Sequence, residues 1–434
     1  MVIYYTLTES SMLIELKVTN FRSINSTQIL STVAAPIKEE NLKNNIFSSG
    51  FKDLQNLVKS VVIYGANAAG KSNIIEAIDF VQNFVRDSAK ESQAGETIEN
   101  ITPFLLDKET PDLPSEFELL FVADEILYEY GFALTSKQVV HEWLYAYPQG
   151  KPQRWFERIY DEETNKYDWY LNSKKLPGRR KFWQESTRDN ALFLSTAVML
   201  NSTKLQPVLN WISRDLVIFT SGTKLSRMFT VDFCKDIDKK QKVLEFLQAA
   251  DLNIVDFKSE EEKITEHDLP DNLPDEIKKD LLGKARKVMI NFLHTVNETD
   301  DSIEFPLKHE SEGTKRLFAF AGPLIDIFEK GRILFIDELD NSLHPSMVRF
   351  IIELIHNPKF NRNNAQVIFT THDSSTLDNS LLRRDQVWFV EKDKQQSTQL
   401  YPLTDFKPRQ NEALQKGYLE GRYGALPFIS ELNF

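Results

Sequence analysis

The chain of 434 residues lacks several features that mark secreted, disulfide-bonded or membrane-spanning proteins. It has one cysteine, Cys234, which excludes an internal disulfide and a cysteine-cluster metal site and is interpreted as a small apolar core residue. No segment approaches about eighteen uninterrupted apolar residues, and the N-terminus lacks a charged segment followed by an apolar one. Neither a membrane span nor a signal peptide is therefore predicted, and the expected location is the cytoplasm.

The chain also lacks an excess of positive charge and sustained heptad repeats. Its 52 basic and 64 acidic residues give a net charge of −12, which argues against non-specific nucleic-acid binding through the overall electrostatic field. Long coiled-coil arms are not expected, because Pro270 and Pro274 interrupt the only long candidate region. The apolar content of 41% is sufficient for one large core or two moderate ones.

A complete phosphate-binding pattern is present near the N-terminus. The segment Gly65–Ser72 follows the apolar run Val61–Tyr64 and leads into the helical pattern Asn73–Ile78. Glycines in such a loop let backbone N–H groups face phosphate oxygens at a helix N-terminus, a lysine reaches the β- and γ-phosphates, and a serine holds Mg²⁺. The residues predicted to contact the nucleotide here are Gly65, Asn67, Gly70, Lys71, Ser72 and Asn73.

A second pattern lies far downstream, where the apolar strand Ile333–Ile336 ends in Asp337 and Glu338. Asp337 is predicted to join Ser72 in binding Mg²⁺, and Glu338 is predicted to act as the general base that polarises the attacking water. Taken alone, two adjacent carboxylates are at least as consistent with a solvated strand end as with a metal site.

Two further segments favour the phosphate-site interpretation. Ser311–Arg316 forms a small-residue turn before the apolar helical stretch Leu317–Ile327, which places a helix N-terminus where an anion would bind. The β-rich run Val367–Thr371 ends at His372, at the spacing expected of a side chain that senses the γ-phosphate. Four such elements in this order are unlikely to coincide by chance.

With these residues, the chain resembles the ABC-type ATPase heads of the SMC, RecF and overcoming-lysogenization-defect group. The matching segments are Walker A (Gly65–Ser72), the signature (Ser311–Thr314), Walker B (Ile333–Glu338), the D-loop (Leu339–Asn341), the switch residue His372 and an opening strand with an Asn-Phe pair (Leu13–Ser23). The resemblance implies ATP and Mg²⁺ as cofactors, with Glu338 and His372 as catalytic residues. It also implies a homodimer or higher homo-oligomer in which Ser311 and Gly313 complete the ATP site in trans, and in which Asp340 also contacts the nucleotide site.

The chain departs from the pattern of this group in two places. Its signature is Ser-Glu-Gly-Thr rather than Ser-Gly-Gly, and the glutamine of the Q-loop has no assigned position. The segments Asp337–Pro345 and Tyr418–Ala425 are similar to those of stand-alone abortive-infection ATPases (RloA-like, AbiL-type and PARIS-type).

The predicted fold is α/β, an ABC-type P-loop ATPase head with a mixed sheet, an antiparallel lobe and an inserted, mainly helical lobe. The expected parts are residues 12–145 and 302–402 for the head, 146–301 for the insert (hairpins, then helices from Asp232 to Val296) and 403–434 for a tail. Residues 1–11, before Met12, are interpreted as an extension or an upstream start. The acidic run Ser259–Glu262 is interpreted as a helix N-terminus with a capping box.

The most basic run of the chain is Lys174–Lys181, which Trp169, Tyr170 and Trp183 flank. One interpretation is a nucleic-acid or nucleotide contact that combines phosphate pairing with stacking. The other is a turn at Pro177-Gly178 with solvated charges and packed tryptophans, which is the commoner situation.

These observations predict a slow, dimerisation-dependent ATPase. Only about sixty residues follow His372, too few for a nuclease domain of the usual size, so an effector is expected to act in trans. The favoured function is a sensor or regulatory ATPase of a bacterial antiphage (abortive-infection) system that controls a separate toxin or nuclease. The alternative is a RecF/SMC-like ATPase that binds DNA in repair or recombination.

Overall fold

The computed structural model describes residues 11–426 except 53, 92, 224, 251, 266–268, 270–272, 275–277, 279–281, 283–285 and 297–300. Of the expected extension 1–11, residues 1–10 lie outside the described residues. The chain forms two compact units. The first consists of residues 1–223, 327–341 and 348–434, and the second of residues 224–326 and 342–347.

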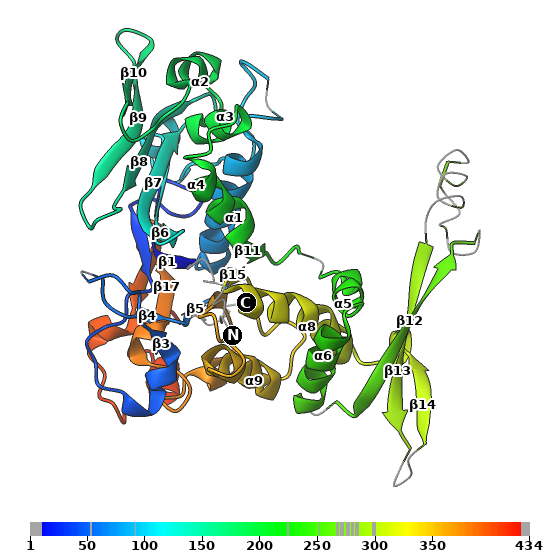
Figure 1. The fold of residues 1–434 in the computed structure, drawn as a ribbon. Coiled ribbons are helices and arrows are strands. Elements are labelled where there is room, and N and C mark those ends of the chain that lie inside the picture. Colours follow the sequence, from blue (N-terminus) through cyan, green and yellow to red (C-terminus); the bar gives the residue numbers. More distant parts are fainter. Residues whose placement is uncertain are drawn as a thin grey trace, which may run out of the picture. The chain divides into compact units, whose positions relative to one another are not determined.

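A six-stranded sheet forms the centre of the first unit (Figure 1). Its strand order is β11-β15-β16-β5-β17-β18, and every neighbouring pair is parallel except β17 and β18. Strands β5, β15 and β16 are buried along their whole length, which explains their continuous apolar runs. The strand bounds are β5 (Ser60–Gly65), β11 (Leu216–Phe219), β15 (Ile333–Ile336), β16 (Gln366–Thr370), β17 (Val387–Lys392) and β18 (Thr398–Pro402).

A seven-stranded antiparallel sheet forms the second layer of this unit, in the order β10-β9-β8-β7-β6-β1-β2. The predicted antiparallel lobe is thus confirmed. Strands β9 and β10 belong to it as well, although the sequence-based division placed them in the insert 146–301. The bounds are β1 (Met12–Thr19), β2 (Gln28–Ser31), β6 (Ser115–Ala123), β7 (Ile126–Leu134), β8 (Val139–Ala146), β9 (Gln153–Asp161) and β10 (Lys166–Leu171).

Helices and short elements complete the first unit. Helix α1 is the next element after β5, and it buries its apolar face in the core shared with both sheets. The helices are α1 (Lys71–Asp87), α2 (Arg180–Ser186), α3 (Phe193–Met199), α4 (Gln206–Asn210) and α10 (Leu414–Leu419). The short strands and single turns are β3 (Ile46–Phe47), β4 (Leu57–Val58), η1 (Glu40–Asn45), η2 (Thr110–Asp112), η3 (Trp211–Asp215), η6 (Ser374–Thr376), η7 (Arg384–Gln386) and η8 (Leu403–Phe406).

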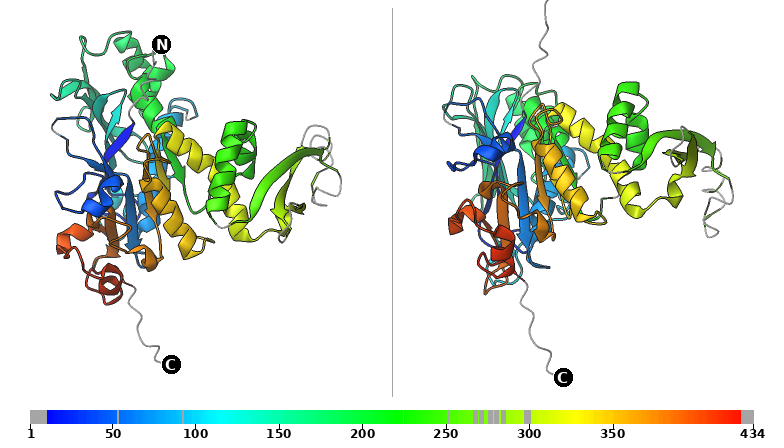
Figure 2. Two further views of the ribbon diagram at one scale, coloured as in Figure 1. Left: turned by 60° about the horizontal axis from the view of Figure 1, so that its bottom comes forward. Right: turned by 90° about the horizontal axis from the view of Figure 1, so that it is seen from below.

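The second unit corrects one prediction. It contains α5 (Arg227–Phe233) and α6 (Ile237–Ala249), but a three-stranded antiparallel sheet then replaces the expected helices. Its strands are β12 (Ile254–Lys263), β13 (Arg286–Thr295) and β14 (Ser302–Pro306), and Figures 1 and 2 show them as a small twisted sheet beside α5 and α6. The helical interpretation of residues 232–296 is therefore wrong for residues 254–263 and 286–295, and correct for α6; much of the segment between the two strands lies outside the described residues.

The acidic run Ser259–Glu262 is likewise not a helix N-terminus, because it lies inside β12. Its backbone pairs with β13 from Ile254 to Lys263, so a partner about thirty residues away satisfies the hydrogen bonds that a helix would have satisfied locally. Three rings packed edge to face then anchor this sheet in the unit's core, since the ring centres of Phe257 and Phe292 lie 5.1 and 5.2 Å from that of Phe318. A pattern within one segment does not reveal such a distant pairing.

Two helices run from one unit into the other along the chain. Helix α8 (Glu312–Lys330) begins in the second unit and ends in the first, and so does α9 (Pro345–His356). Within the second unit, α8 packs closely on α5, since Thr230 Oγ1 donates to the carbonyl of Phe318 over 2.9 Å. A Cβ at Gly322 would lie 2.8 Å from Thr230 Cα, so glycine is needed for this approach.

Candidate nucleotide-binding site

The glycine loop lies between the central strand β5 and helix α1, as the sequence predicts. Gly65, the last residue of β5, runs so close to β17 that a Cβ there would lie 2.4 Å from the carbonyl oxygen of Val390. Gly70 has a φ of +108°, and a Cβ there would meet the hydroxyl of Thr398 at 2.2 Å. Both glycines are therefore required for the loop to turn and to reach the helix start.

Lys71 is the first residue of α1, and only 6% of its surface is exposed. Its ammonium group donates to the loop carbonyls of Gly65 over 2.8 Å and Ala66 over 3.1 Å. Burial lowers the pKa of Lys71, while the nearby carboxylates Asp337, Glu338 and Asp340 raise it. The fold thus brings the lysine of one motif to the acids of another more than 260 positions away.

The acids at the end of β15 are held by a threonine that the sequence analysis did not single out. Thr370 Oγ1, at the end of the neighbouring strand β16, donates to Asp337 Oδ1 over 2.7 Å and accepts from the Glu338 backbone N–H over 2.7 Å. The backbone of Glu338 has a φ of +52°, in a region that residues other than glycine seldom adopt. Strain of this kind persists where surrounding contacts fix the backbone, as Thr370 does here.

Asp340 and His372 also meet. The backbone N–H of His372 points at the Asp340 carboxylate, with distances of 3.2 and 3.4 Å to its two oxygens. His372 is exposed, and four residues further along the chain the Thr376 hydroxyl lies 2.5 Å from the hydroxyl of Tyr64 on β5. The predicted D-loop and switch residues therefore share the sheet edge that carries the glycine loop.

Ser23 and Thr398 support the loop from outside it, and neither was predicted to do so. Asn73, on α1, donates its side-chain amide to Ser23, whose hydroxyl lies 2.7 Å from that of Thr398. Thr398 in turn donates to the carbonyl of Ala69 over 2.9 Å. Ser23 lies two residues after the Asn20-Phe21 pair that follows the first strand, a usable signal, whereas nothing around Thr398 in the sequence indicates its contact.

In the second unit, Ser311 stands at the start of α8. Its hydroxyl accepts from the Thr314 backbone N–H over 3.0 Å and lies 2.9 Å from the Thr314 hydroxyl. Gly313 is unlike the loop glycines, because a Cβ there would meet nothing closer than 3.6 Å. Contacts among the described residues therefore do not require glycine at this position.

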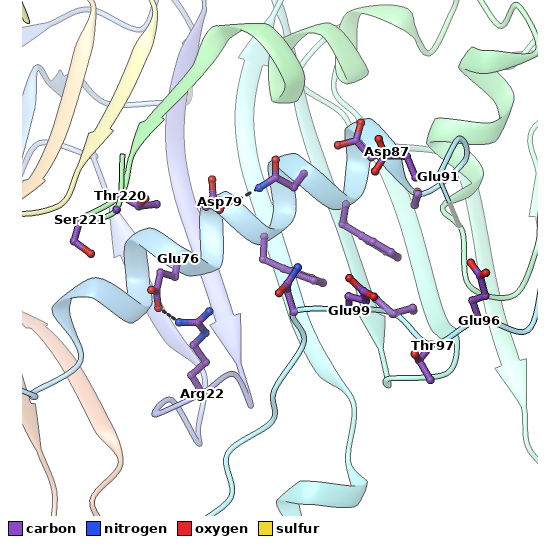
Figure 3. A pocket seen from close by; sticks show the side chains of 17 residues that line it. Arg22, Glu76, Asp79, Asp87, Glu91, Glu96, Thr97, Glu99, Thr220 and Ser221 are labelled. Atoms are coloured by element: carbon purple, nitrogen blue, oxygen red, sulfur yellow. Dashed lines mark hydrogen bonds and ion pairs between the residues drawn. The ribbon is translucent and has the colours of Figure 1, made fainter. Parts of the chain in front are cut away.

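A large hollow in the first unit does not suit a nucleotide (Figure 3). It has a volume of about 1070 Å³ and runs along α1 towards Thr220 and Ser221 at the end of β11. Arg22 lines it and forms an ion pair with Glu76, and burial raises the pKa of Asp79 there. The other side chains lining it that carry charge are acidic, which disfavours a triphosphate: Asp87, Glu91, Glu96 and Glu99.

Two further sequence interpretations can be compared with the structure. Cys234 is buried, as predicted, and burial raises the pKa of its thiol to about 12. The predicted turn at Pro177-Gly178 is displaced: the chain turns at residues 173–175 and only bends at Gly178, which has a φ of +117° against the buried ring of Trp183.

A family model matches residues 60–378, and its description reads "AAA domain, putative AbiEii toxin, Type IV TA system". The chain belongs to this family. The match spans the glycine loop, the acids of β15 and His372, and it confirms the relation to abortive-infection ATPases that the sequence motifs indicated. No curated protein matches the chain by sequence.

Solved structures of SMC heads are similar to this chain. "Crystal structure of the SmcHead bound to the C-winged helix domain of ScpA" is 14% identical, with a TM-score of 0.41, and the match covers 90% of this chain and 96% of that chain. "SMC head domain from Thermotoga maritima" is 14% identical, with a TM-score of 0.39, and the match covers 90% and 98%. The predicted α/β fold class is confirmed by the strand order of the first unit, a mixed sheet with an antiparallel lobe, and the family match gives the ATPase-type domain.

The residues at the sheet edge fit a magnesium nucleotide. Two glycines let the loop pack against Val390 and Thr398 where a Cβ would clash, the buried ammonium of Lys71 lies beside the loop, and Ser72 and Asp337 carry oxygen atoms of the type that Mg²⁺ prefers. None of the described helices is long and apolar enough to cross a membrane.

Proposed function

We propose that the protein is a cytosolic ATPase that hydrolyses ATP with Mg²⁺ at the edge of the six-stranded sheet. The main support is the convergence of Lys71 with Asp337, Glu338 and Asp340 beside a glycine loop. In this proposal the backbone of Gly65 to Asn73 binds the phosphates, Ser72 and Asp337 hold Mg²⁺, and Asn67 borders the site from the loop. Mg²⁺ held by these residues would supply charge neutralisation at the phosphates.

Glu338 is the proposed general base, and His372 the proposed group that stabilises charge on the γ-phosphate. The support is positional, since Glu338 is half-buried beside Asp337 while His372 is exposed and tied through its backbone to Asp340. Replacing Glu338 by glutamine keeps the shape of the side chain but removes the base. We expect Glu338→Gln to bind ATP with unchanged affinity and to lose turnover at least about a hundredfold. Normal turnover by this variant would refute the assignment.

Hydrolysis is proposed to require two chains. The support lies in Gly313, because nothing among the described residues needs a glycine there, whereas the backbone of a phosphate-binding turn must be approached closely from outside. In a symmetric dimer, Ser311 and Gly313 of one chain would then complete the site of the other.

Mixing two inactive variants tests this arrangement. Lys71→Ala removes the phosphate contact and Gly313→Asp blocks the signature, so neither should turn over ATP alone. In a 1:1 mixture about half of the dimers are mixed and each carries one intact site, so about a quarter of the wild-type rate should return. A mixture as inactive as its components would show that each chain builds its site alone.

The ATPase cycle is proposed to regulate a separate toxin or nuclease in bacterial antiphage defence. The support is the family description, which names a toxin and a type IV toxin–antitoxin system. Purification with the products of neighbouring genes, followed by native mass spectrometry with and without ATP, tests it. A stable complex with a distinct effector supports the proposal, whereas an ATP-dependent homodimer that retains only DNA and is stimulated by it would support the RecF/SMC-like alternative.

A further inference from the structure

One region of the first unit carries concentrated positive charge in an otherwise acidic chain. From Trp169 to Gln184 the sequence contains five cations and no acid, against a net charge of −12 for the whole. We call these cations, with the neighbouring Arg154 and two exposed rings, the basic surface: Arg154, Tyr170, Lys174, Lys175, Arg179, Arg180, Lys181 and Phe182. It lies where β10 ends and the chain passes into α2 (Figure 1).

The loop that carries these cations is fixed by its own contacts. Asn172 Oδ1 accepts from the backbone N–H groups of Lys174 and Lys175, both at 3.1 Å, so the two lysines share one turn. Arg180 donates to the carbonyl of Leu176 over 2.8 Å. Because Leu176 is fully buried, the loop is anchored in the core and its exposed cations stand on a defined frame.

Most of this charge is not neutralised within the chain. Among the residues that the structure describes, Lys174, Lys175 and Arg179 are exposed and form no ion pair. Lys181 has only a long contact of 3.7 Å to Glu185, in which both side chains are mostly exposed. Exposed pairs of this kind contribute little and are screened by salt, so the surface keeps a strong attraction for an anionic partner.

Two exposed rings lie among the cations, and an arginine covers each. The guanidinium of Arg154 is 3.8 Å from the ring centre of Tyr170, and that of Arg179 is 4.2 Å from the ring centre of Phe182. Tyr170 and Phe182 are 39% and 40% exposed as whole residues. The guanidinium of Arg154 also donates to Glu157 over 2.6 Å, so a carboxylate already shares the charge of that stack, whereas Arg179 forms no ion pair among the described residues. A guanidinium over an exposed ring is a surface on which an unpaired base stacks.

The basic surface also borders a hollow beside Leu171. Its volume is about 540 Å³, within the range of pockets that hold small planar groups, and the cations of the loop form its wall. The residues that line it are Leu171, Gly178, Arg179, Arg180, Lys181, Phe182 and Gln184.

We propose that the basic surface binds single-stranded nucleic acid. The lysines and arginines pair with phosphates, and the Arg154–Tyr170 and Arg179–Phe182 stacks hold unpaired bases. An acidic protein would satisfy the charges but not the exposed planar stacks. A membrane surface needs an apolar helix face, whereas α2 has seven residues and turns Trp183 into the core. This inference goes beyond the ATPase proposal, because the binding of a nucleic-acid strand to this surface can be measured in the absence of ATP.

The test is fluorescence anisotropy with the full chain and labelled homopolymers of about twenty nucleotides, oligo-dT and oligo-U, beside a duplex of the same length. We expect the two single strands to bind and the duplex to bind at least about tenfold more weakly. The ratio of oligo-dT to oligo-U then identifies the kind of strand. Equal or tighter binding of the duplex would overturn the proposal, and so would no binding of either single strand at low salt.

Charge reversal locates the site. The triple variant Lys174→Glu/Lys175→Glu/Arg179→Glu should abolish binding. Replacing the same three residues by alanine should reduce the slope of log affinity against log salt by about 2, at roughly 0.7 per lost phosphate contact on a single strand. The matched control is Lys43→Glu/Lys90→Glu/Lys137→Glu, which changes the net charge equally at exposed positions elsewhere in the first unit. An equal loss in the control would mean that only net charge matters and would refute the site.

The stacking role has its own variant. Tyr170→Leu keeps an apolar strand residue but removes the ring, so it should weaken binding of oligo-dT about tenfold without changing the salt slope. The thermal midpoint and the basal ATPase rate of each variant report whether the fold is intact. An intact Tyr170→Leu variant that binds as tightly as wild type would refute the stacking contribution.

Discussion

Replacing Thr370 by valine removes a single hydroxyl group from the centre of the candidate site. That hydroxyl donates to Asp337 Oδ1 and accepts from the Glu338 backbone N–H, both over 2.7 Å, and the side chain is fully buried. Valine has nearly the same shape, so the change opens no cavity and adds no atom. Its effect therefore isolates the two hydrogen bonds.

The expected loss of stability follows from these contacts. A hydrogen bond to a charged group is worth about 1.5–3 kcal/mol, and an N–H group left unpaired in a buried place costs about 1–3 kcal/mol. Because Glu338 is only half-buried, water compensates part of the second cost. We expect Thr370→Val to lower the free energy of unfolding by about 3 kcal/mol. Freeing the Asp337 carboxylate and the strained Glu338 backbone should also reduce ATP turnover about tenfold.

The chain offers a selective assay for this loss. All six tryptophans lie in the first unit, at positions 143, 155, 169, 183, 211 and 388, so tryptophan fluorescence during urea unfolding follows that unit. Thr370→Ser is the matched control, because it keeps the hydroxyl and loses only a methyl group. It should retain most of the stability and turnover.

The result that would refute this reasoning is equally specific. If Thr370→Val unfolds within about 0.5 kcal/mol of wild type and hydrolyses ATP normally, the hydroxyl does not hold the two acids in place. If Thr370→Ser loses as much as Thr370→Val, packing rather than hydrogen bonding accounts for the effect.

Three further changes have calculable outcomes. Gly65→Ala places a Cβ 2.4 Å from the Val390 carbonyl, so it should destabilise the first unit by at least about 2 kcal/mol in the urea assay and weaken ATP binding, whereas Gly222→Ala, with no atom within 3.8 Å, should not. Glu142 and Arg158 form a fully buried ion pair, and Glu142 also accepts from two backbone N–H groups at the start of α3. Glu142→Gln leaves the arginine charge uncompensated and should lower the free energy of unfolding by about 3 kcal/mol or more. A decrease below about 1 kcal/mol would contradict this account. Burial lowers the pKa of His356 to about 3 from 6.5, so below pH 6.5 the unfolded chain binds a proton that the folded chain does not, and stability should fall as the pH drops towards 3, by about 2 kcal/mol at pH 5. His356→Gln should flatten this dependence between pH 6.5 and 3, and an unchanged acid sensitivity would show that other groups cause it.

The local motifs were predictable because each follows from a short stretch of chain. The glycine loop between an apolar strand and a helix, and the apolar strand ending in Asp337 and Glu338, are formed by contiguous residues whose periodicity and turn chemistry are visible directly. Both lie where they were expected.

The contacts between motifs were not predictable in the same way. Thr370 is one of two threonines at the end of β16, and only the parallel register with β15 shows that it, and not Thr371, meets the acids. Thr398 reaches the loop carbonyl of Ala69 from 329 positions away. Side chains separated by hundreds of residues meet through strand order, which no local pattern encodes.

The error in the second unit has the same origin. Residues 254–263 contain an acidic run that suits a helix start locally, but pairing with β13 and packing of Phe257 on Phe318 place them in a strand. Secondary-structure preferences of this size are weak, and tertiary contacts override them.

The sequence by itself determined the kind of chemistry, since glycine, lysine, serine and paired carboxylates at fixed spacings suit a magnesium nucleotide whatever surrounds them. The tertiary structure decided which residues act together: the three acids beside Lys71, the threonine that orients two of them, and the exposed cations around Tyr170 and Phe182. The physical reason is the distance along the chain over which each property is determined. Backbone conformation and helix or strand period depend on neighbours in the chain, whereas the burial, charge and hydrogen bonding of a site depend on groups that only folding brings within a few ångströms.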